Sequence, residues 1–208
     1  MYIPKHFSET NSSKLIAFMK QYNFGIVVNT KNNIPLATHL PFIIEQRDEK
    51  VFLLSHMALA NEQWNYFDGS EVLVIFAEPH AYISPSFYEK KQNVPTWNFV
   101  AVHCYGIPQL IEDEAAKLQL MEKTITVFEE AYMKQFRELD SKYVNGLLKC
   151  IKAFEIQVIR MEGKYKLSQN KTQTERANII GSFEKSENDQ LKAIAQLMKQ
   201  QENDRHND

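Results

Sequence analysis

The alternation of hydrophobic and polar residues predicts a mainly β chain in which helices separate some of the strands. Runs rich in β-branched and aromatic residues, joined by short polar turns, are typical of antiparallel hairpins. In the turn at residues 31–33, asparagine tolerates the left-handed backbone that a tight turn needs. The strands expected from this pattern cover residues 24–30, 36–44, 51–55, 72–77, a segment around Tyr82, 97–111 and 151–161.

Helical spacing and capping residues predict the remaining elements. Leu15, Ile16, Met19 and Tyr22 fall on one face of a helix that starts near residue 10. Asn61 is a candidate N-cap for a short helix over residues 62–69. Later helices are expected over residues 114–136 and 143–149. Two more should follow the capping-box spacings 172/175 and 186/189, with a polar tail after residue 200.

These elements together predict an α+β, mainly β fold in a single domain. Six or seven short strands, with helices at the periphery and the C-terminus, fit a small closed antiparallel barrel. The expected domain covers residues 1–181, and residues 182–208 form its C-terminal helical extension and polar tail. A length of 208 residues suits one well-cored domain.

Composition restricts the location and the partners. The chain is 44% hydrophobic and 24% charged, a balance typical of globular proteins, and it has no run of about 20 apolar residues. Cys104 and Cys150 lack metal-ligand spacing and form no disulfide framework. We therefore expect a cytoplasmic protein. A net charge of −2 argues against a general attraction to nucleic acid.

Residues 80–106 concentrate aromatic side chains, histidines and prolines between two strand-like runs. Aromatic faces with a few fixed polar groups suit a flat conjugated ligand, because stacking supplies affinity and the polar groups fix its orientation. The same composition also suits an aromatic barrel core joined by a proline-bearing turn. The residues alone leave both interpretations open.

In several short motifs, which we call phrases, the sequence resembles the FMN-binding negative transcriptional regulators. The phrases that carry the resemblance are PHAYISPSFY and VPTWNFVAVHCYG in the aromatic stretch and MYIPKHF, ATHLPF, SHMALANEQW and GKYKLSQN outside it. They occur in the order typical of that family and extend from Met1 to about Gly181. The best-known member of this bacterial family negatively regulates protease synthesis and sporulation.

The resemblance implies a fold, a cofactor and a role. The fold is a Greek-key split β-barrel like that of pyridoxamine phosphate oxidases, usually dimeric, with FMN between the subunits. The implied role is a flavin-binding regulator that represses protease and sporulation genes, acting as a homodimer on DNA or through a regulatory protein partner. The alternative is a flavin-dependent oxidoreductase of the split-barrel type, in which His103 or Tyr88 donates a proton.

The resemblance also implies which residues contact FMN. The turn from Ser55 to Asn61 offers backbone amides, a hydroxyl and an imidazole to the phosphate, as expected where a strand meets a helix N-terminus. For His39, His56 and His103 the structural alternative is a partly buried imidazole whose hydrogen bonds are made within the protein. For the GKYKLSQN phrase it is a surface loop that caps the barrel. The candidate cofactor-binding residues are Thr38, His39, Ser55, His56, Met57, Asn61, Trp64, Trp97, Asn98, His103, Lys166, Ser168 and Gln169.

One departure from the family's phrase weakens the expected phosphate contact. Many relatives have arginine where this chain has Leu59. If that arginine neutralises the phosphate, its replacement removes a charge-assisted contact of roughly 1.5 to 3 kcal/mol. Lys164 or Lys166 could compensate for it.

Other chemistries have no support in the sequence. The histidines are spread over separate strands without an HxxxH or CxxC pair, so a metal centre is not expected. Ser84 and Ser86 do not stand in a nucleophile elbow, and no phosphate-binding glycine loop is present. No basic recognition helix for DNA is evident either. We name no catalytic residue.

Overall fold

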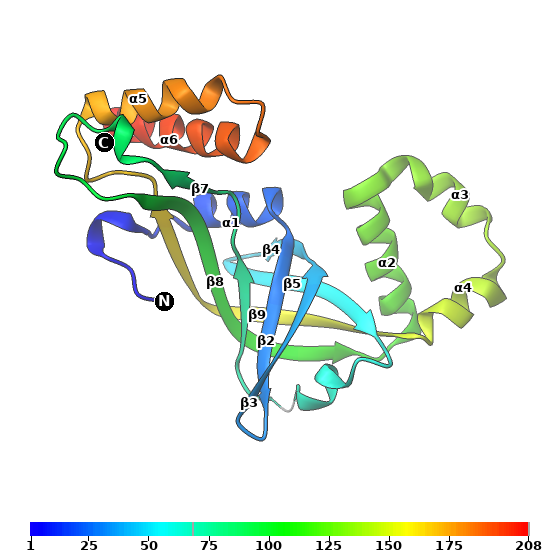
Figure 1. Ribbon diagram of the computed structural model, residues 1–208. Helices are drawn as coiled ribbons and strands as arrows, with labels where there is room; N and C mark the ends of the chain where they lie inside the picture. Colours follow the sequence, from blue (N-terminus) through cyan, green and yellow to red (C-terminus); the bar gives the residue numbers. More distant parts are fainter. Residues whose placement is uncertain (68, 208) are drawn as a thin grey trace. The chain divides into compact units, whose positions relative to one another are not determined.

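The computed structural model describes residues 1–67 and 69–207, and for residues 204–207 it describes the backbone alone. Its strands form one mostly antiparallel sheet in the order β3-β2-β6-β8-β9-β5-β4; in addition β1 pairs with β9, and β7 pairs with β8 (Figure 1). The strands are β1 (Ser8–Glu9), β2 (Phe24–Lys31), β3 (Ile34–Pro41), β4 (Ile43–Arg47), β5 (Lys50–Ala58), β6 (Val72–Phe76), β7 (His80–Ile83), β8 (Thr96–Ile111) and β9 (Ile151–Lys166).

Helices occupy the segments between and after these strands. The α-helices are α1 (Ser12–Gln21), α2 (Glu114–Glu129), α3 (Met133–Glu138), α4 (Ser141–Leu148), α5 (Gln173–Glu184) and α6 (Asp189–Asn207). Short 3₁₀ helices are η1 (Lys5–Phe7), η2 (Glu62–Tyr66), η3 (Pro85–Phe87) and η4 (Glu130–Tyr132). None of the described helices combines the length and apolarity that crossing a membrane requires.

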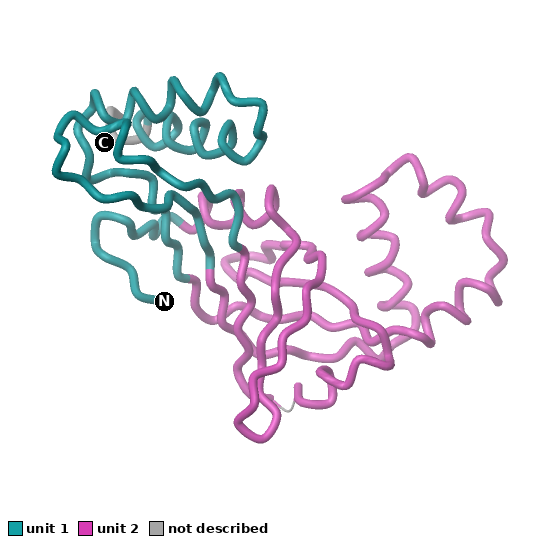
Figure 2. Tube along the Cα trace, in the orientation of Figure 1, with its two compact units in different colours: residues 1–11, 77–102, 162–208 teal, residues 12–76, 103–161 magenta. Residues whose placement is uncertain are grey.

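The chain forms two compact units, each built from separate stretches of sequence (Figure 2). Unit 1 comprises residues 1–11, 77–102 and 162–208, and unit 2 comprises residues 12–76 and 103–161. Strands β8 and β9 contribute residues to both units. The C-terminal segment 182–208 thus belongs to the same unit as the N-terminus, and the predicted division at residue 181 stays a prediction.

Unit 2 is centred on three phenylalanines that are fully buried. The ring of Phe42 meets those of Phe76 and Phe154 edge-on, with centroids 5.7 Å and 6.4 Å away. Such edge-to-face pairs add to the energy of burial. Gly106 on β8 lies so close to β9 that an added Cβ would be 2.3 Å from the Gln157 carbonyl oxygen. Only glycine therefore fits at this strand crossing.

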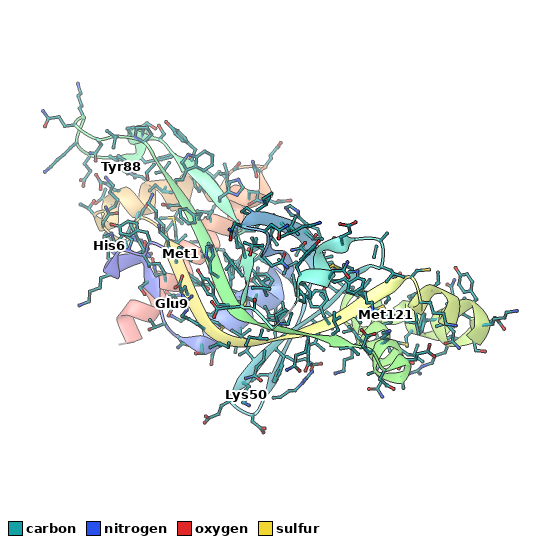
Figure 3. All side chains as sticks on the ribbon, turned by 90° about the horizontal axis from the view of Figure 1, so that it is seen from below. Met1, His6, Glu9, Lys50, Tyr88 and Met121 are labelled. Carbon is teal, nitrogen blue, oxygen red and sulfur yellow. The ribbon has the colours of Figure 1, made fainter. Side chains whose placement is uncertain are left out.

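Unit 1 packs the two C-terminal helices against each other and against the short strand β7. Helices α5 and α6 run side by side (Figure 1). They bury Ile179, Ile194 and Met198 completely. The rings of Phe87 and Phe183 of α5 pack edge-to-face, with centroids 5.9 Å apart. This contact attaches the segment 79–88 to the helices. The described side chains are drawn in Figure 3.

The predicted fold class is confirmed, since the chain is a mainly antiparallel split barrel with peripheral helices. The left-handed turn is confirmed by positive φ angles at Asn32 and Asn33. The Thr172/Glu175 capping box is present as predicted. Hydrophobic alternation and capping chemistry were therefore sufficient to locate most elements.

Several predicted strand boundaries were wrong. Residues 36–44 are two strands rather than one, because Phe42 turns into the core and its amide bonds the Asn23 carbonyl. The first helix begins at Ser12, because Ser8 and Glu9 pair with β9 as a strand. Strand β9 itself continues to Lys166, so the start of the GKYKLSQN phrase is a strand and not a loop.

Three predicted helices also differ. The helix after Asn61 is a five-residue 3₁₀ helix that ends at Tyr66. The helix expected over 114–136 breaks at Glu129, whose φ of −156° is not helical, and Met133 is then buried. The tail after residue 200 is helical through Asn207, where an ion pair between Glu202 and Arg176 holds α6. Asn188, rather than Ser186, accepts from the Gln190 amide at its start.

Candidate functional site

The predicted cofactor residues fall into two groups, one in each unit. In unit 1 they lie at the start of β8, at the end of β9 and just after β9; these are Trp97, Asn98, Lys166, Ser168 and Gln169. In unit 2 they lie on β3, β5, β8 and around η2; these are Thr38, His39, Ser55, His56, Met57, Asn61, Trp64 and His103. Each group is described by itself below.

Unit 1 contains a cavity of about 240 Å³, which we call the Tyr88 pocket. Its walls come from four of the phrases quoted above, although these are far apart in sequence. MYIPKHF supplies Phe7, PHAYISPSFY supplies Tyr88, the VPTWN segment supplies Thr96 and Asn98, and GKYKLSQN supplies Lys166, Ser168 and Asn170. Figure 3 labels Tyr88 within this unit. Folding therefore brings four of the six phrases of the family resemblance to one place.

Two lysines make the Tyr88 pocket cationic. The Lys166 ammonium donates to the Thr96 hydroxyl and, at 2.6 Å, to the Trp97 carbonyl. Burial, with a smaller contribution from nearby Lys164, lowers the pKa of Lys166. The Lys171 ammonium lies 3.7 Å from the centroid of the Tyr88 ring and donates to Asn93 Oδ1 at 2.8 Å. A bound anion would stabilise the charge of both lysines.

The Tyr88 hydroxyl is a buried polar group with no hydrogen-bond partner among the described residues. Tyr88 is only 8% exposed. Burial, together with the charge of Glu175, raises the pKa of this phenol, so it stays protonated and can donate. Leaving such a donor unsatisfied costs about 1–3 kcal/mol, which an acceptor that came within hydrogen-bond distance would recover.

A network of buried polar contacts fixes the floor of the pocket. Asn98 is completely buried, and its side-chain amide exchanges hydrogen bonds with the Ser168 hydroxyl, each at 3.0 Å. Ser168 adopts a left-handed backbone with φ of 60°, a strained conformation for serine. Arg176 of α5 holds the preceding residue by donating to the Leu167 carbonyl at 2.7 Å. Gln169 closes the same turn through the Leu167 amide at 2.7 Å.

Trp97 does not share this pocket, although its neighbours do. Side chains alternate along a strand, so Trp97 faces away from the side of β8 that carries Thr96 and Asn98. Its ring is 51% exposed. It lies 6.0 Å from the Tyr82 ring and 5.8 Å from the His80 ring on the paired strand β7. These residues form an exposed aromatic cluster on the opposite face.

In unit 2, Thr38 and Asn61 belong to a closed hydrogen-bond network around Gln63. Asn61 donates to the Thr38 hydroxyl at 2.9 Å, and that hydroxyl bonds the Gln63 side chain. Gln63 is 3% exposed and also donates to the Val27 carbonyl at 3.1 Å and to Asn29 at 3.0 Å. The network attaches η2 to β2 and β3. The side chains of Thr38 and Asn61 therefore form hydrogen bonds within the protein.

The expected anion turn after Ser55 has a different geometry from the one predicted. Strand β5 continues through Ala58, so the turn itself is only Leu59 and Ala60 before η2. The Leu59 amide donates to the Cys150 carbonyl at 2.8 Å, and the Asn61 amide donates to the Ala58 carbonyl at 2.9 Å. These amides are engaged by the protein, and η2 is too short to provide a strong helix dipole.

The remaining residues of the β5 segment are mostly structural. The Ser55 hydroxyl donates to the Pro41 carbonyl at 2.6 Å, and Met57 is 2% exposed. His56 lies on the other face of the strand, where burial lowers the pKa of its imidazole. The lowered pKa keeps His56 neutral at physiological pH.

The aromatic and histidine candidates of unit 2 are dispersed. Trp64 donates from its indole nitrogen to the Leu59 carbonyl at 3.0 Å, and the Lys152 ammonium lies 4.6 Å from its ring centroid. His39 is exposed and stacks on Phe24 at 6.3 Å. His103 lies beside the Tyr105 ring at 6.5 Å.

Leu59 is 44% exposed, which bears on the departure noted in the sequence. An arginine there would extend from the surface rather than from the core. Lys152, whose ammonium lies over the Trp64 ring, is paired with Glu112 at 3.0 Å. The Leu59 position therefore carries no positive charge of its own, whereas the Tyr88 pocket has two lysines.

Sequence reasoning missed part of the Tyr88 pocket. Lys171 follows directly after the GKYKLSQN phrase, and Thr96 lies inside VPTWN, but neither was among the predicted cofactor residues. Tyr88 was considered only as a proton donor. Proximity to the quoted phrases was the available signal. Among the described residues, no cluster of histidine, cysteine, aspartate or glutamate could hold a metal ion.

The residues of the Tyr88 pocket fit one end of FMN. Two ammonium groups and an unsatisfied hydroxyl donor suit a phosphate. The volume lies below the range of about 300–1,000 Å³ for sites that enclose a whole ligand, so the pocket would take only part of the molecule.

Comparison with known proteins identifies relatives over nearly the full chain. Residues 1–160 match the family described as "Putative FMN-binding domain". The chain is 40% identical, over 95% of its length and 96% of the relative's, to the Bacillus subtilis protein named "Protease synthase and sporulation protein PAI 2". It is also 31% identical to an uncharacterized protein of Saccharomyces cerevisiae, covering 68% of this chain and 98% of that one.

Solved structures share the fold at low sequence identity. The flavocytochrome Anf3 of Azotobacter vinelandii superimposes with a TM-score of 0.62 and 14% identity, covering 79% of this chain and 72% of that one. An FAD and heme binding protein of Mycobacterium smegmatis gives a TM-score of 0.58 and 14% identity, covering 77% and 73%. At these identities the likeness establishes the fold alone.

Proposed function

This chain belongs to the FMN-binding domain family, and from that premise we propose that it is a flavin-binding regulatory protein. The family match over residues 1–160 carries the flavin part of the proposal. The regulatory part is supported by 40% identity, over almost the whole of both chains, to a relative named for protease synthesis and sporulation. Both agree with the phrases recognised in the sequence.

The phosphate end of FMN is assigned to the Tyr88 pocket. Lys166 and Lys171 provide charge, and the Tyr88 hydroxyl donates a hydrogen bond. The buried Asn98–Ser168 pair keeps the segment that bears Lys166 in place. The cationic pocket thus takes over the task that an arginine at position 59 was expected to perform.

A bound FMN would supply electron-transfer chemistry and a redox-dependent charge on its ring. The residues of this chain would bind and orient it, with Tyr88 and Asn98 on the buried side of the pocket. The polar lining of the pocket consists of lysines, hydroxyls and amides.

The finer elements of the role are proposals that agree with the family resemblance. We assign to the protein repression of protease and sporulation genes, a cytoplasmic location and a homodimeric state. With a net charge of −2, the protein has little electrostatic attraction for DNA, which favours regulation through a protein partner over direct binding.

Titration of the purified protein with FMN, followed by flavin fluorescence, tests the proposal. We expect saturable quenching in the micromolar range, with a single FMN per chain. Riboflavin, which lacks the phosphate, is the matched ligand control. It should bind about tenfold or more weakly, because it forms none of the charge-assisted contacts.

Two results would contradict the proposal in different ways. Absence of FMN binding by the folded protein would remove the flavin function altogether. Equal affinity for riboflavin and FMN would leave flavin binding intact but would show that the Tyr88 pocket does not hold the phosphate.

A further inference from the structure

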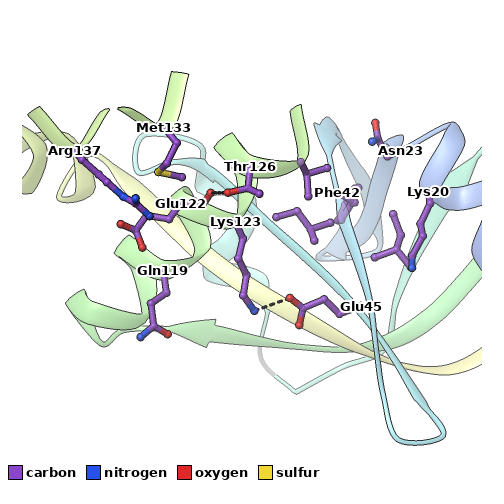
Figure 4. Close-up of a pocket in the computed structure, with 13 residues that line it drawn as sticks. Lys20, Asn23, Phe42, Glu45, Gln119, Glu122, Lys123, Thr126, Met133 and Arg137 are labelled. Atoms are coloured by element: carbon purple, nitrogen blue, oxygen red, sulfur yellow. Dashed lines mark hydrogen bonds and ion pairs between the residues drawn. The ribbon is translucent and has the colours of Figure 1, made fainter. Parts of the chain in front are cut away.

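Unit 2 contains a cavity of about 670 Å³ that shares no residue with the Tyr88 pocket or with the predicted cofactor residues. It lies between α1 and β4 on one side and α2 and α3 on the other (Figure 4). This volume falls within the range typical of small-molecule sites. The flavin proposal makes no use of this cavity.

The inner wall of the cavity is apolar. Phe42 and Ile43 at the β3–β4 junction are buried, and Met133 at the start of α3 is 9% exposed. Val127 of α2 also lines the cavity and is 55% exposed, although valine normally gains from burial. An apolar group in the cavity would cover Val127 and complete the packing of α2.

The charged groups at the rim give an excess of positive charge. Glu45 is already neutralised, since Lys123 donates to it at 2.6 Å and Arg47 donates at 2.8 Å. Figure 4 shows the Lys123–Glu45 contact, with Lys20 and Arg137 elsewhere on the lining. Lys20 and Arg137 form no ion pair within the part of the chain that the structure describes.

The lining therefore holds three basic side chains, Lys20, Lys123 and Arg137, against two acidic ones, Glu45 and Glu122. One positive charge remains after these are balanced. An arginine guanidinium matches a carboxylate with two parallel hydrogen bonds, a geometry that an ammonium cannot provide.

From this combination of apolar wall and unpaired cation, we propose that the cavity binds a small amphipathic carboxylate, with its apolar body against Ile43, Met133 and Val127 and its carboxylate at Arg137. The site would let the protein respond to a carboxylate metabolite independently of flavin. This inference does not depend on the proposed function.

Isothermal titration of the full-length protein with dodecanoate, below its micelle concentration, tests the inference. Val127→Trp should place an indole ring across the space proposed for the apolar body and abolish binding, whereas Val127→Ala leaves that space open and should bind within about threefold of the parent. The half-exposed position of Val127 makes both variants compatible with folding. Arg137→Gln should weaken binding about tenfold, because it removes a charge-assisted contact.

The matched control for Arg137 is Lys134→Gln, which removes a positive charge from the same helix at an exposed position outside the cavity lining. It should leave dodecanoate affinity unchanged. Dodecanol should bind the parent protein more weakly than dodecanoate does. In the Arg137→Gln variant the two ligands should bind with equal affinity. The inference is supported if the parent protein binds dodecanoate saturably, Val127→Trp abolishes this binding, and Arg137→Gln weakens it while Lys134→Gln does not. Absence of saturable binding, or binding indifferent to Val127→Trp, overturns it.

Discussion

At the scale of single residues, Tyr88 combines a cost to the free protein with a proposed role in FMN binding. Its buried hydroxyl has no partner among the described residues. Tyr88→Phe should therefore stabilise the ligand-free protein by about 1 kcal/mol, because it removes an unsatisfied donor. The same change should weaken FMN binding about tenfold, because the phosphate loses a hydrogen bond. Urea unfolding and flavin titration measure the two effects.

The control for this prediction is Tyr82→Phe, which removes a hydroxyl from a tyrosine that is 50% exposed and outside the pocket. It should change neither stability nor FMN affinity appreciably. Riboflavin affinity should be the same in the Tyr88→Phe variant and the parent. A variant that loses stability and binds FMN normally would show that the Tyr88 hydroxyl has a structural partner and no ligand.

At the scale of secondary-structure elements, the close approach of β8 and β9 at Gly106 gives a second prediction. An alanine Cβ would lie 2.3 Å from the Gln157 carbonyl oxygen, which is backbone and cannot rotate away. Gly106→Ala should lower the free energy of unfolding by about 2–4 kcal/mol, through displacement of one strand. Thermal and urea denaturation would measure it.

Gly146 in α4 provides the opposite case. A Cβ there meets nothing within 4 Å, and the backbone is already helical. Gly146→Ala should raise stability by about 0.5–1 kcal/mol, because alanine loses less conformational freedom in a helix. Equal effects of the two substitutions would contradict the contact assigned to Gly106.

The same elements show what local sequence can predict. Alternation located β2 and β5, and capping chemistry located the starts of η2, α2 and α5, because both depend on residues close together in the chain. The break at Phe42 and the helical tail were not predictable in this way. They depend on burial of Phe42 against distant strands and on the ion pair from Arg176 to Glu202.

At the scale of the whole molecule, the composition of the site was more predictable than its geometry. The phrases around Tyr88, Asn98 and Lys166 were recognised, but which of them would meet depends on the pairing of β7 with β8 and on the course of the chain after β9. Alternation in β8 then separates Trp97 from Asn98, although they are adjacent in sequence. Non-local pairing is information that periodicity does not contain.

The overall charge gives the last prediction. DNA affinity at physiological salt comes largely from neutralising phosphates with clustered lysine and arginine, and this chain carries 24 such residues against 26 acidic ones. We expect no binding of a labelled DNA duplex at physiological salt, with or without FMN, when measured by fluorescence anisotropy. Dimerisation would double the negative charge and would not change this result. Binding that survives competitor DNA and falls steeply with salt would instead require a basic face formed in the assembly, and regulation would then act directly on DNA.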